Sequence, residues 1–230
     1  MLSAAEWGVV ALSLKVSLAA MAATLPVAYA LAWLLARRRF PGRTVLDALV
    51  HLPLVVPPVV TGWILLLLFG RAGPVGALLE RSLGITLMFR WTGAALAAAV
   101  MALPLMVRAM RLSIEAVDRR LVQAARTLGA GRLRAFLTIT LPLSVPGILA
   151  GAMLGFARSL GEFGATITFV SNIPGETRTI PLAIYSGLQV PGSEWAVTRL
   201  ALISVALSFA ALLASEWLVR RRGAKDRHVL

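Results

Sequence analysis

The sequence predicts an all-α protein, a bundle of about five helices that cross a membrane. Of its 230 residues, 59% are hydrophobic and only 14% are charged, too few to cover a soluble domain of this size. Apolar runs long enough to cross a bilayer recur along the chain, and short basic blocks separate them. We therefore expect membrane lipid to surround most of the surface.

The candidate spanning helices are the apolar runs of roughly 20 residues or more. They cover residues 9–36, 45–69, 91–107, 143–170 and 196–219. Together they define one transmembrane domain over residues 9–219, followed by a basic tail over residues 220–230. We expect no cleavable signal, because Glu6 is acidic where a signal carries basic residues and the following apolar run is too long.

The basic residues predict the orientation of the chain, whose net charge is +13. Lys and Arg gather in cytoplasmic loops, and the dense blocks follow the first, third and fifth apolar runs. An N-terminus outside and a C-terminus in the cytoplasm place all three blocks on one face, whereas a sixth span would break this asymmetry. Once these blocks are assigned to the cytoplasmic loops, no basic face remains that could bind nucleic acid. The blocks are Arg37, Arg38, Arg39 and Arg43; Arg108, Arg111, Arg119, Arg120, Arg126, Arg132 and Arg134; and Arg220, Arg221, Arg222, Lys225 and Arg227.

The composition excludes several kinds of chemistry. The chain has no cysteine, so disulfides, thiol catalysis and cysteine metal sites are ruled out. His51 and His228 alone make a poor metal site, and we expect no cofactor bound by this chain. An intramembrane enzyme needs a nucleophile with a base, or a metal cluster, at membrane depth. That function is a distant alternative, and a membrane scaffold is another.

Residues 115–142 form the largest inner loop. Asp118 can cap a short helix, and Gly129 and Gly131 can end it. Pro142 marks the return to the membrane. The pattern predicts a compact helical knob, which either docks on a partner or packs on its own bundle. One apolar face of the knob consists of Leu121, Ala124, Ala125 and Leu128, and a second short helix carries Leu133, Phe136 and Leu137.

This loop resembles the cytoplasmic signature of ABC-importer permeases: Glu-Ala-Ala, three residues, Gly, nine residues, Ile, one residue, Leu-Pro. Gln123 departs from this signature, which has glutamate at that position. Glutamine keeps an acceptor oxygen but lacks the charge. The resemblance implies a type I importer-permease fold, in which the loop docks on an ATPase subunit. The chain has no phosphate-binding Gly-x-x-x-x-Gly-Lys-Ser/Thr loop, so ATP and Mg are expected on that partner. The matching positions are Gln123, Ala124, Ala125, Gly129, Ile139, Leu141 and Pro142.

Residues 156–166, 171–181 and 51–60 resemble the molybdate transporter permeases. The core from Arg158 to Gly164 is shared with sulfate and thiosulfate permeases, whereas the continuation from Asn172 to Pro181 favours molybdate. The resemblance implies import of a tetrahedral oxyanion, with sulfate, thiosulfate and tungstate as alternatives to molybdate. It also implies two permease chains, two ATPase subunits and an extracytoplasmic oxyanion-binding protein, at the inner membrane of a bacterium.

Prolines in the second apolar run and charges in the fourth are candidates for the translocation pathway. Pro53, Pro57 and Pro58 remove backbone donors, and freed carbonyls are tolerated where they line a watery cavity or are buried in protein. The run is therefore a pathway element or a static kink. Arg158 and Glu162 can pair at i, i+4. A charge at the bilayer centre costs roughly 2.5–3.5 kcal/mol, so both should face the bundle or a cavity.

We expect Arg158 either to supply positive potential to an anion, with Glu162 holding it in place, or to form a purely structural ion pair. Neutral donors near the outer mouth could contact an oxyanion or could simply be loop polarity; these are Thr166, Thr168, Ser171 and Asn172. Lys15 is expected to extend toward the membrane interface.

Overall fold

The computed structural model describes residues 3–226, and of residues 215–226 it describes only the helical backbone. Residues 227–230 of the predicted tail lie outside the described part. The elements are α1 (Ala4–Arg37), α2 (Arg43–Val55), α3 (Pro58–Phe69), α4 (Pro74–Leu83), α5 (Trp91–Ala116), α6 (Arg119–Thr127), α7 (Arg132–Ala135), the π-helical turn η1 (Phe136–Thr140), α8 (Leu141–Leu160), α9 (Gly164–Val170), α10 (Ile180–Gly187) and α11 (Glu194–Asp226).

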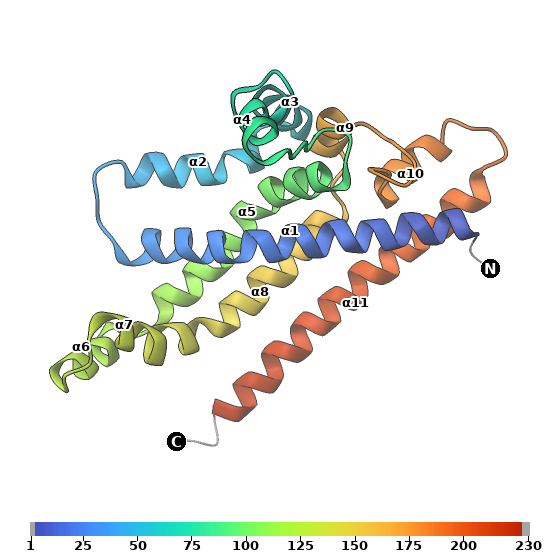
Figure 1. Cartoon of the computed structure of the whole chain (residues 1–230). Coiled ribbons are helices and arrows are strands. Elements are labelled where there is room, and N and C mark those ends of the chain that lie inside the picture. Colours follow the sequence, from blue (N-terminus) through green and yellow to red (C-terminus); the bar gives the residue numbers. More distant parts are fainter. Residues whose placement is uncertain (1–2, 227–230) are drawn as a thin grey trace.

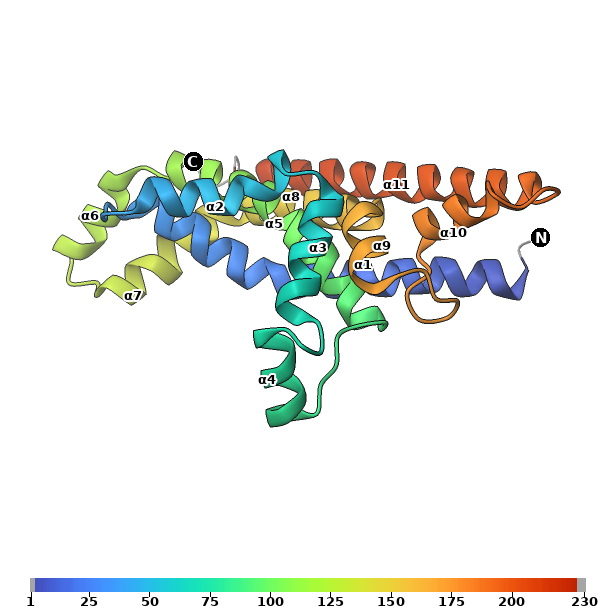
Figure 2. The same ribbon diagram turned by 90° about the horizontal axis from the view of Figure 1, so that it is seen from above.

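The described residues include four helical stretches that are long and apolar enough to cross a membrane: α1, α5, α11 and the continuous run from α7 through α8. The α2–α3 pair counts as a fifth if a bent pair is one span. This agrees with the prediction of about five spans. The bundle is elongated, with α6 and α7 at one end and α10 at the other (Figure 1), and α3 and α4 project from its side (Figure 2).

Two of the predicted spans are interrupted. The run 45–69 bends by 117° between α2 and α3. Pro57 causes the break because a residue before proline avoids the helical region, and Val56 is extended. Pro58 then starts α3, where its missing N–H is not needed. The helix continues through Pro53, so of the three prolines only Pro57 and Pro58 lie at the break.

The run 143–170 was expected to be one span, but α8 ends at Leu160 and α9 begins at Gly164. The run 91–107 is longer than predicted, because α5 continues to Ala116 and carries Arg108 and Arg111 on its last turns. A prediction from hydropathy places the end of a span at such charges, whereas the helix itself can continue beyond the membrane surface.

The centre of the bundle depends on very small side chains. Gly147, Gly151 and Gly155 repeat every fourth residue on α8 and are buried against α5. A Cβ added at Gly147 would lie 2.2 Å from the Cβ of Ser113, and one at Gly155 would lie 2.4 Å from the Sδ of Met106. Small residues let membrane helices approach closely, and this stripe places α8 directly against α5.

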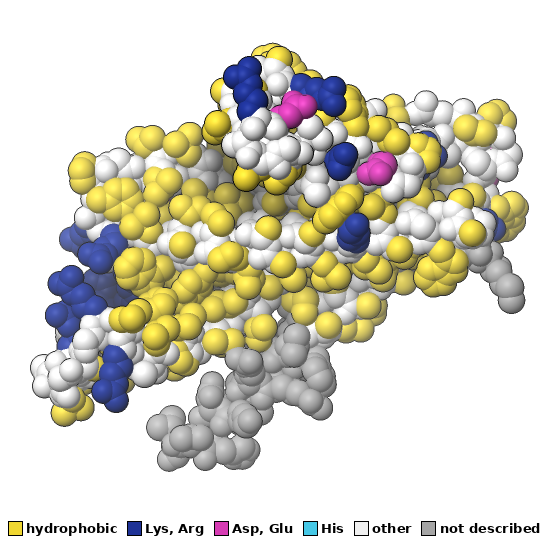
Figure 3. All heavy atoms as spheres, in the orientation of Figure 1, with side chains coloured by type: hydrophobic (Ala, Val, Ile, Leu, Met, Phe, Trp, Pro, Cys, Tyr) yellow, Lys and Arg dark blue, Asp and Glu magenta, His cyan; other side chains and the backbone are white. Residues whose placement is uncertain are grey.

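The surface is apolar around the bundle and basic at one end. Hydrophobic side chains cover most of the face in Figure 3, and Lys and Arg side chains gather at the end that carries α6 and α7. Away from that end, the ammonium of Lys15 lies 3.8 Å from the ring centroid of Trp91, a cation–π contact near the start of α5.

Candidate functional site

The first half of the signature forms a capped helix. Asp118 accepts a hydrogen bond from the backbone N–H of Arg120 at 2.8 Å, as predicted for a capping residue. The helix α6 ends in a Schellman motif, since the Ala130 N–H donates to the Ala125 carbonyl and the Gly129 N–H donates to the Arg126 carbonyl. Gly129 has a φ of +88°, which only glycine adopts without strain. The glycine of the signature is therefore required by the turn.

The apolar face of α6 is uncovered in this chain. Leu128 is 89% exposed and Leu121 is 49% exposed. Gln123 and Ala124 are also exposed, whereas Ala125 is half-buried. Packing against its own bundle, the alternative left open by the sequence, does not account for this face.

The second half of the signature forms the root of the loop. Ile139 lies in the π-helical turn and is half-buried, and Leu141 and Pro142 begin α8. The signature thus joins an exposed tip to a partly buried base.

Arg158 and Glu162 form an ion pair across the break between α8 and α9. Their Nη1 and Oε2 atoms are 2.6 Å apart, and the Glu162 side chain is 2% exposed while that of Arg158 is 27% exposed. The other oxygen of Glu162 accepts from the Ala165 N–H at 2.9 Å, at the first turn of α9. A carboxylate is favourable at a helix N-terminus and a guanidinium at a C-terminus. The pair therefore stabilises the interruption of the span.

The two interrupted spans meet. A Cβ on Gly164 would lie 2.7 Å from the Cβ of Pro58, and one on Gly62 would lie 2.6 Å from the Ala165 carbonyl oxygen. The break after α2 and the break after α8 are therefore neighbours, and α3 packs on α9. Sequence reasoning found both sets of residues but gave no indication that they touch. Gly62 and Gly164 are the sequence feature that could have indicated this contact, because small residues in membrane helices often mark a close approach of two helices.

Two of the four predicted neutral donors, Thr168 and Asn172, form side-chain hydrogen bonds within the chain, whereas Ser171 is exposed. Thr166 is buried, and the hydroxyl of Thr168 donates to the Gly164 carbonyl. The amide nitrogen of Asn172 donates to Leu182 and Ser186, and its oxygen accepts from Arg178. In this conformation these groups organise the segment between α9 and α10.

A charged groove lies between α2 and α5, and the sequence did not predict it. The groove has a volume of about 510 Å³. Arg111 lies 2.9 Å from Asp47 and 2.9 Å from Glu115, and His51 lies 3.2 Å from Asp47. The i, i+4 spacing of Asp47 and His51 was a signal, but Arg111 was assigned to a loop. Among the described residues no group of three His, Cys, Asp or Glu could hold a metal ion.

A bundle with two adjoining broken spans and an exposed, glycine-terminated loop helix fits the membrane-spanning subunit of an ABC importer, the class that the comparison with known proteins shows. The chain belongs to the family of binding-protein-dependent transport system inner membrane components, whose family model matches residues 26–223. Within this family, it is 61% identical over 215 residues to the molybdenum transport system permease protein ModB of Escherichia coli (strain K12), which covers 94% of each chain.

Other relatives support the same placement. The ModB protein of Haemophilus influenzae is 56% identical over 220 residues, 96% of each chain. The sulfate transport system permease protein CysT of Escherichia coli (strain K12) is 42% identical over 159 residues, 69% of this chain and 57% of CysT. These two ModB proteins are thus more similar to the chain than this sulfate permease is, and they match over a greater length.

Solved structures confirm the predicted fold. An inward-facing structure of the MetNI methionine ABC transporter matches with a TM-score of 0.69 at 15% identity, covering 94% of this chain and 93% of that chain. A bacterial ABC transporter involved in the import of the acidic polysaccharide alginate matches with a TM-score of 0.74 at 19% identity, covering 96% and 80%. The protein is a multi-pass inner-membrane permease with the type I importer fold.

Proposed function

We propose that this chain is the permease subunit of an ATP-driven importer of molybdate. The assignment of molybdate as the substrate rests on the 61% identity to a molybdenum permease over 94% of the chain, compared with 42% identity to a sulfate permease over 69% of the chain. Sulfate is the second candidate, because the core from Arg158 to Gly164 is common to both kinds of permease.

The coupling loop, residues 115–142, docks on an ATPase subunit. Support comes from the uncovered apolar face of α6, with Leu128 89% exposed at its tip. Docking buries these side chains and removes apolar surface from water. Gln123 contributes a hydrogen-bonding oxygen at this surface without a charge. ATP and Mg bind to the ATPase, and the hydrolysis of ATP there moves the loop.

The complete transporter contains two copies of this permease, two ATPase subunits and an extracytoplasmic oxyanion-binding protein. Five helices are too few both to enclose a path and to open it, so a symmetric pair is the economical arrangement. The basic end of the bundle faces the cytoplasm under the positive-inside rule, which puts the N-terminus outside and the C-terminus inside. The transport domain covers residues 9–219 and the basic tail residues 220–230.

The pathway runs beside the adjoining breaks of α2–α3 and α8–α9. Pro57 and Pro58 interrupt one span there, Pro53 lies one turn before them, and Thr166 lies on α9. Arg158 is 27% exposed, so its guanidinium can attract an anion while Glu162 holds it in place. An anion that binds to Arg158 more strongly in one state of the permease than in the other shifts the equilibrium between the two states, and such shifts drive alternating access.

The test is ATP hydrolysis by the complex reconstituted from this chain, its ATPase and its binding protein, with molybdate, tungstate or sulfate supplied. Stimulation by molybdate and not by sulfate is expected. Stimulation by sulfate moves the substrate to the second candidate, and failure of the ATPase to associate refutes the docking role.

A further inference from the structure

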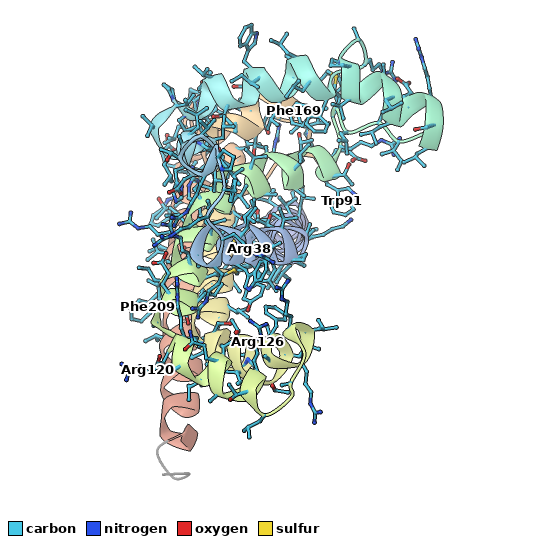
Figure 4. All side chains as sticks on the ribbon, turned by 90° about the vertical axis from the view of Figure 1, so that its left-hand side faces the viewer. Arg38, Trp91, Arg120, Arg126, Phe169 and Phe209 are labelled. Atoms are coloured by element: carbon cyan, nitrogen blue, oxygen red, sulfur yellow. The ribbon has the colours of Figure 1, made fainter. Side chains whose placement is uncertain are left out.

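One end of α1 carries a stripe of large side chains on a single face. Tyr29, Trp33 and Arg37 are spaced by four residues, which places them one above another on a helix. This end of α1 lies toward the end of the bundle that carries α6 and α7, where Figure 4 labels Arg38, just after α1, and Arg126 on α6. The stripe contacts both ends of the coupling loop.

Arg37 holds the start of the loop. Its Nη2 donates to the Ile114 carbonyl at 2.7 Å and to the Val117 carbonyl at 3.0 Å. These carbonyls end α5, where helical partners run out and a positive charge is favourable. Asp118, the cap of α6, is the next residue. Arg37 therefore fixes the point at which α6 leaves the bundle.

Tyr29 and Trp33 hold the end of the loop. The ring of Phe136, the first residue of η1, has its centroid 6.1 Å from the ring of Tyr29 and 6.1 Å from that of Trp33. The Tyr29 hydroxyl also shares a hydrogen bond of 2.9 Å with Ser144, which is fully buried on α8. Both ends of the loop are thus attached to the same face of α1.

The π-helical turn makes this attachment significant. Such turns are rare, occur frequently at functional sites, and can return to α-helical hydrogen bonding by a shift of one residue. A displacement of α6 and α7 could be absorbed by that shift. The contacts of Phe136 with two rings on α1 oppose it.

The opposite end of α1 is attached as well. Ser13 accepts a hydrogen bond from the Ile180 N–H at 2.7 Å, in the first turn of α10. Glu6, which is buried, pairs with Arg199 of α11 at 2.7 Å. A single helix therefore connects the coupling loop to the α10 end of the molecule.

We propose that Tyr29, Trp33 and Arg37 form a clamp that makes α1 move with the coupling loop, so that the loop's displacement reaches α10 through α1. This inference rests on the proposed function. The three side chains act as positioning residues, because they hold the loop and touch neither ATP nor the transported anion.

The test compares Arg37→Met with Arg39→Met in the reconstituted complex. Both changes remove one positive charge from the same basic block, but Arg39 is exposed and lies beyond the end of α1. We expect Arg37→Met to keep ATPase association and basal ATP hydrolysis. The molybdate transported per ATP should fall about ten-fold, because the loss of a hydrogen bond from a charged donor weakens the equilibrium that holds the loop on α1 by about that factor. Arg39→Met should match the wild type. Arg37→Lys, which keeps a donor, should recover part of the loss.

Amide hydrogen exchange supplies a readout that does not need the substrate. In Arg37→Met, exchange at residues 114–120 should rise about ten-fold relative to Arg39→Met, with residues 136–144 less affected. Tyr29→Phe should raise exchange at residues 136–144. Equal exchange and equal transport per ATP in the two methionine variants would overturn the clamp. A wild-type complex that does not respond to molybdate overturns the proposed function, while the exchange comparison still decides the clamp.

Discussion

Replacing Glu162 by glutamine removes the charge that neutralises Arg158 but keeps an oxygen that can accept from the Ala165 N–H. Breaking a fully buried pair costs roughly 3–5 kcal/mol, and an exposed pair contributes about 0–1 kcal/mol. Glu162 is 2% exposed and Arg158 is 27% exposed, so this pair lies between the two cases. We expect the free energy of unfolding to fall by about 2 kcal/mol, or roughly 30-fold in the equilibrium constant.

Glu162→Ala also removes the acceptor for the Ala165 N–H, which is 2.9 Å from Glu162 in the native protein. A lost N-terminal helix cap costs about 1 kcal/mol more. The assay is unfolding in mixed micelles with increasing SDS, followed by tryptophan fluorescence. Glu176→Gln is the matched control, because Glu176 is exposed and its replacement should change the unfolding free energy by less than about 0.5 kcal/mol. The reasoning is refuted if Glu162→Gln unfolds like the control.

Three further substitutions test other parts of the structure. Gly147→Ala places a Cβ 2.2 Å from Ser113 and should destabilise the bundle by about 1–3 kcal/mol, whereas Gly8→Ala, with open space around it, should not destabilise it; the same SDS titration compares them. Gly129→Val forces a β-branched residue to a φ of +88° and should reduce co-purification of the ATPase, whereas Gly131→Ala should not. Leu128→Asp, at a side chain 89% exposed, should leave unfolding within about 0.5 kcal/mol of the wild type but abolish ATPase association; normal association would contradict docking through this face.

The number of spans and the coupling loop could be predicted from the sequence because both depend on local signals. Hydrophobic length predicts a spanning helix, and Asp118 and Gly129 mark the two ends of α6 through backbone geometry alone. The capping role of Asp118 is confirmed at 2.8 Å.

The features that the sequence did not predict depend on contacts between distant residues. Pro57 predicts a break, but its neighbour across the fold, Gly164, comes from another helix. Arg111 was assigned to a loop because hydropathy counts its charge, while in the structure Asp47 and Glu115 pair with it. The clamp was not predicted for the same reason, because its contacts join distant residues. Arg37 also belongs to a basic block that the positive-inside rule already explains.

The glycine stripe on α8 determines which parts of the permease can move. At Gly147 and Gly151 the backbone of α8 lies so close to α5 that an added Cβ would approach the Ala109 and Met106 carbonyl oxygens to 3.0 and 3.2 Å. The side chains of Ser113, Met110 and Met106 on α5 fill the space over this stripe, so the two helices have little room to slide or rotate past each other. We therefore expect the α5–α8 pair to move as one unit, so that a displacement of the coupling loop, which joins these two helices, is passed to both of them together.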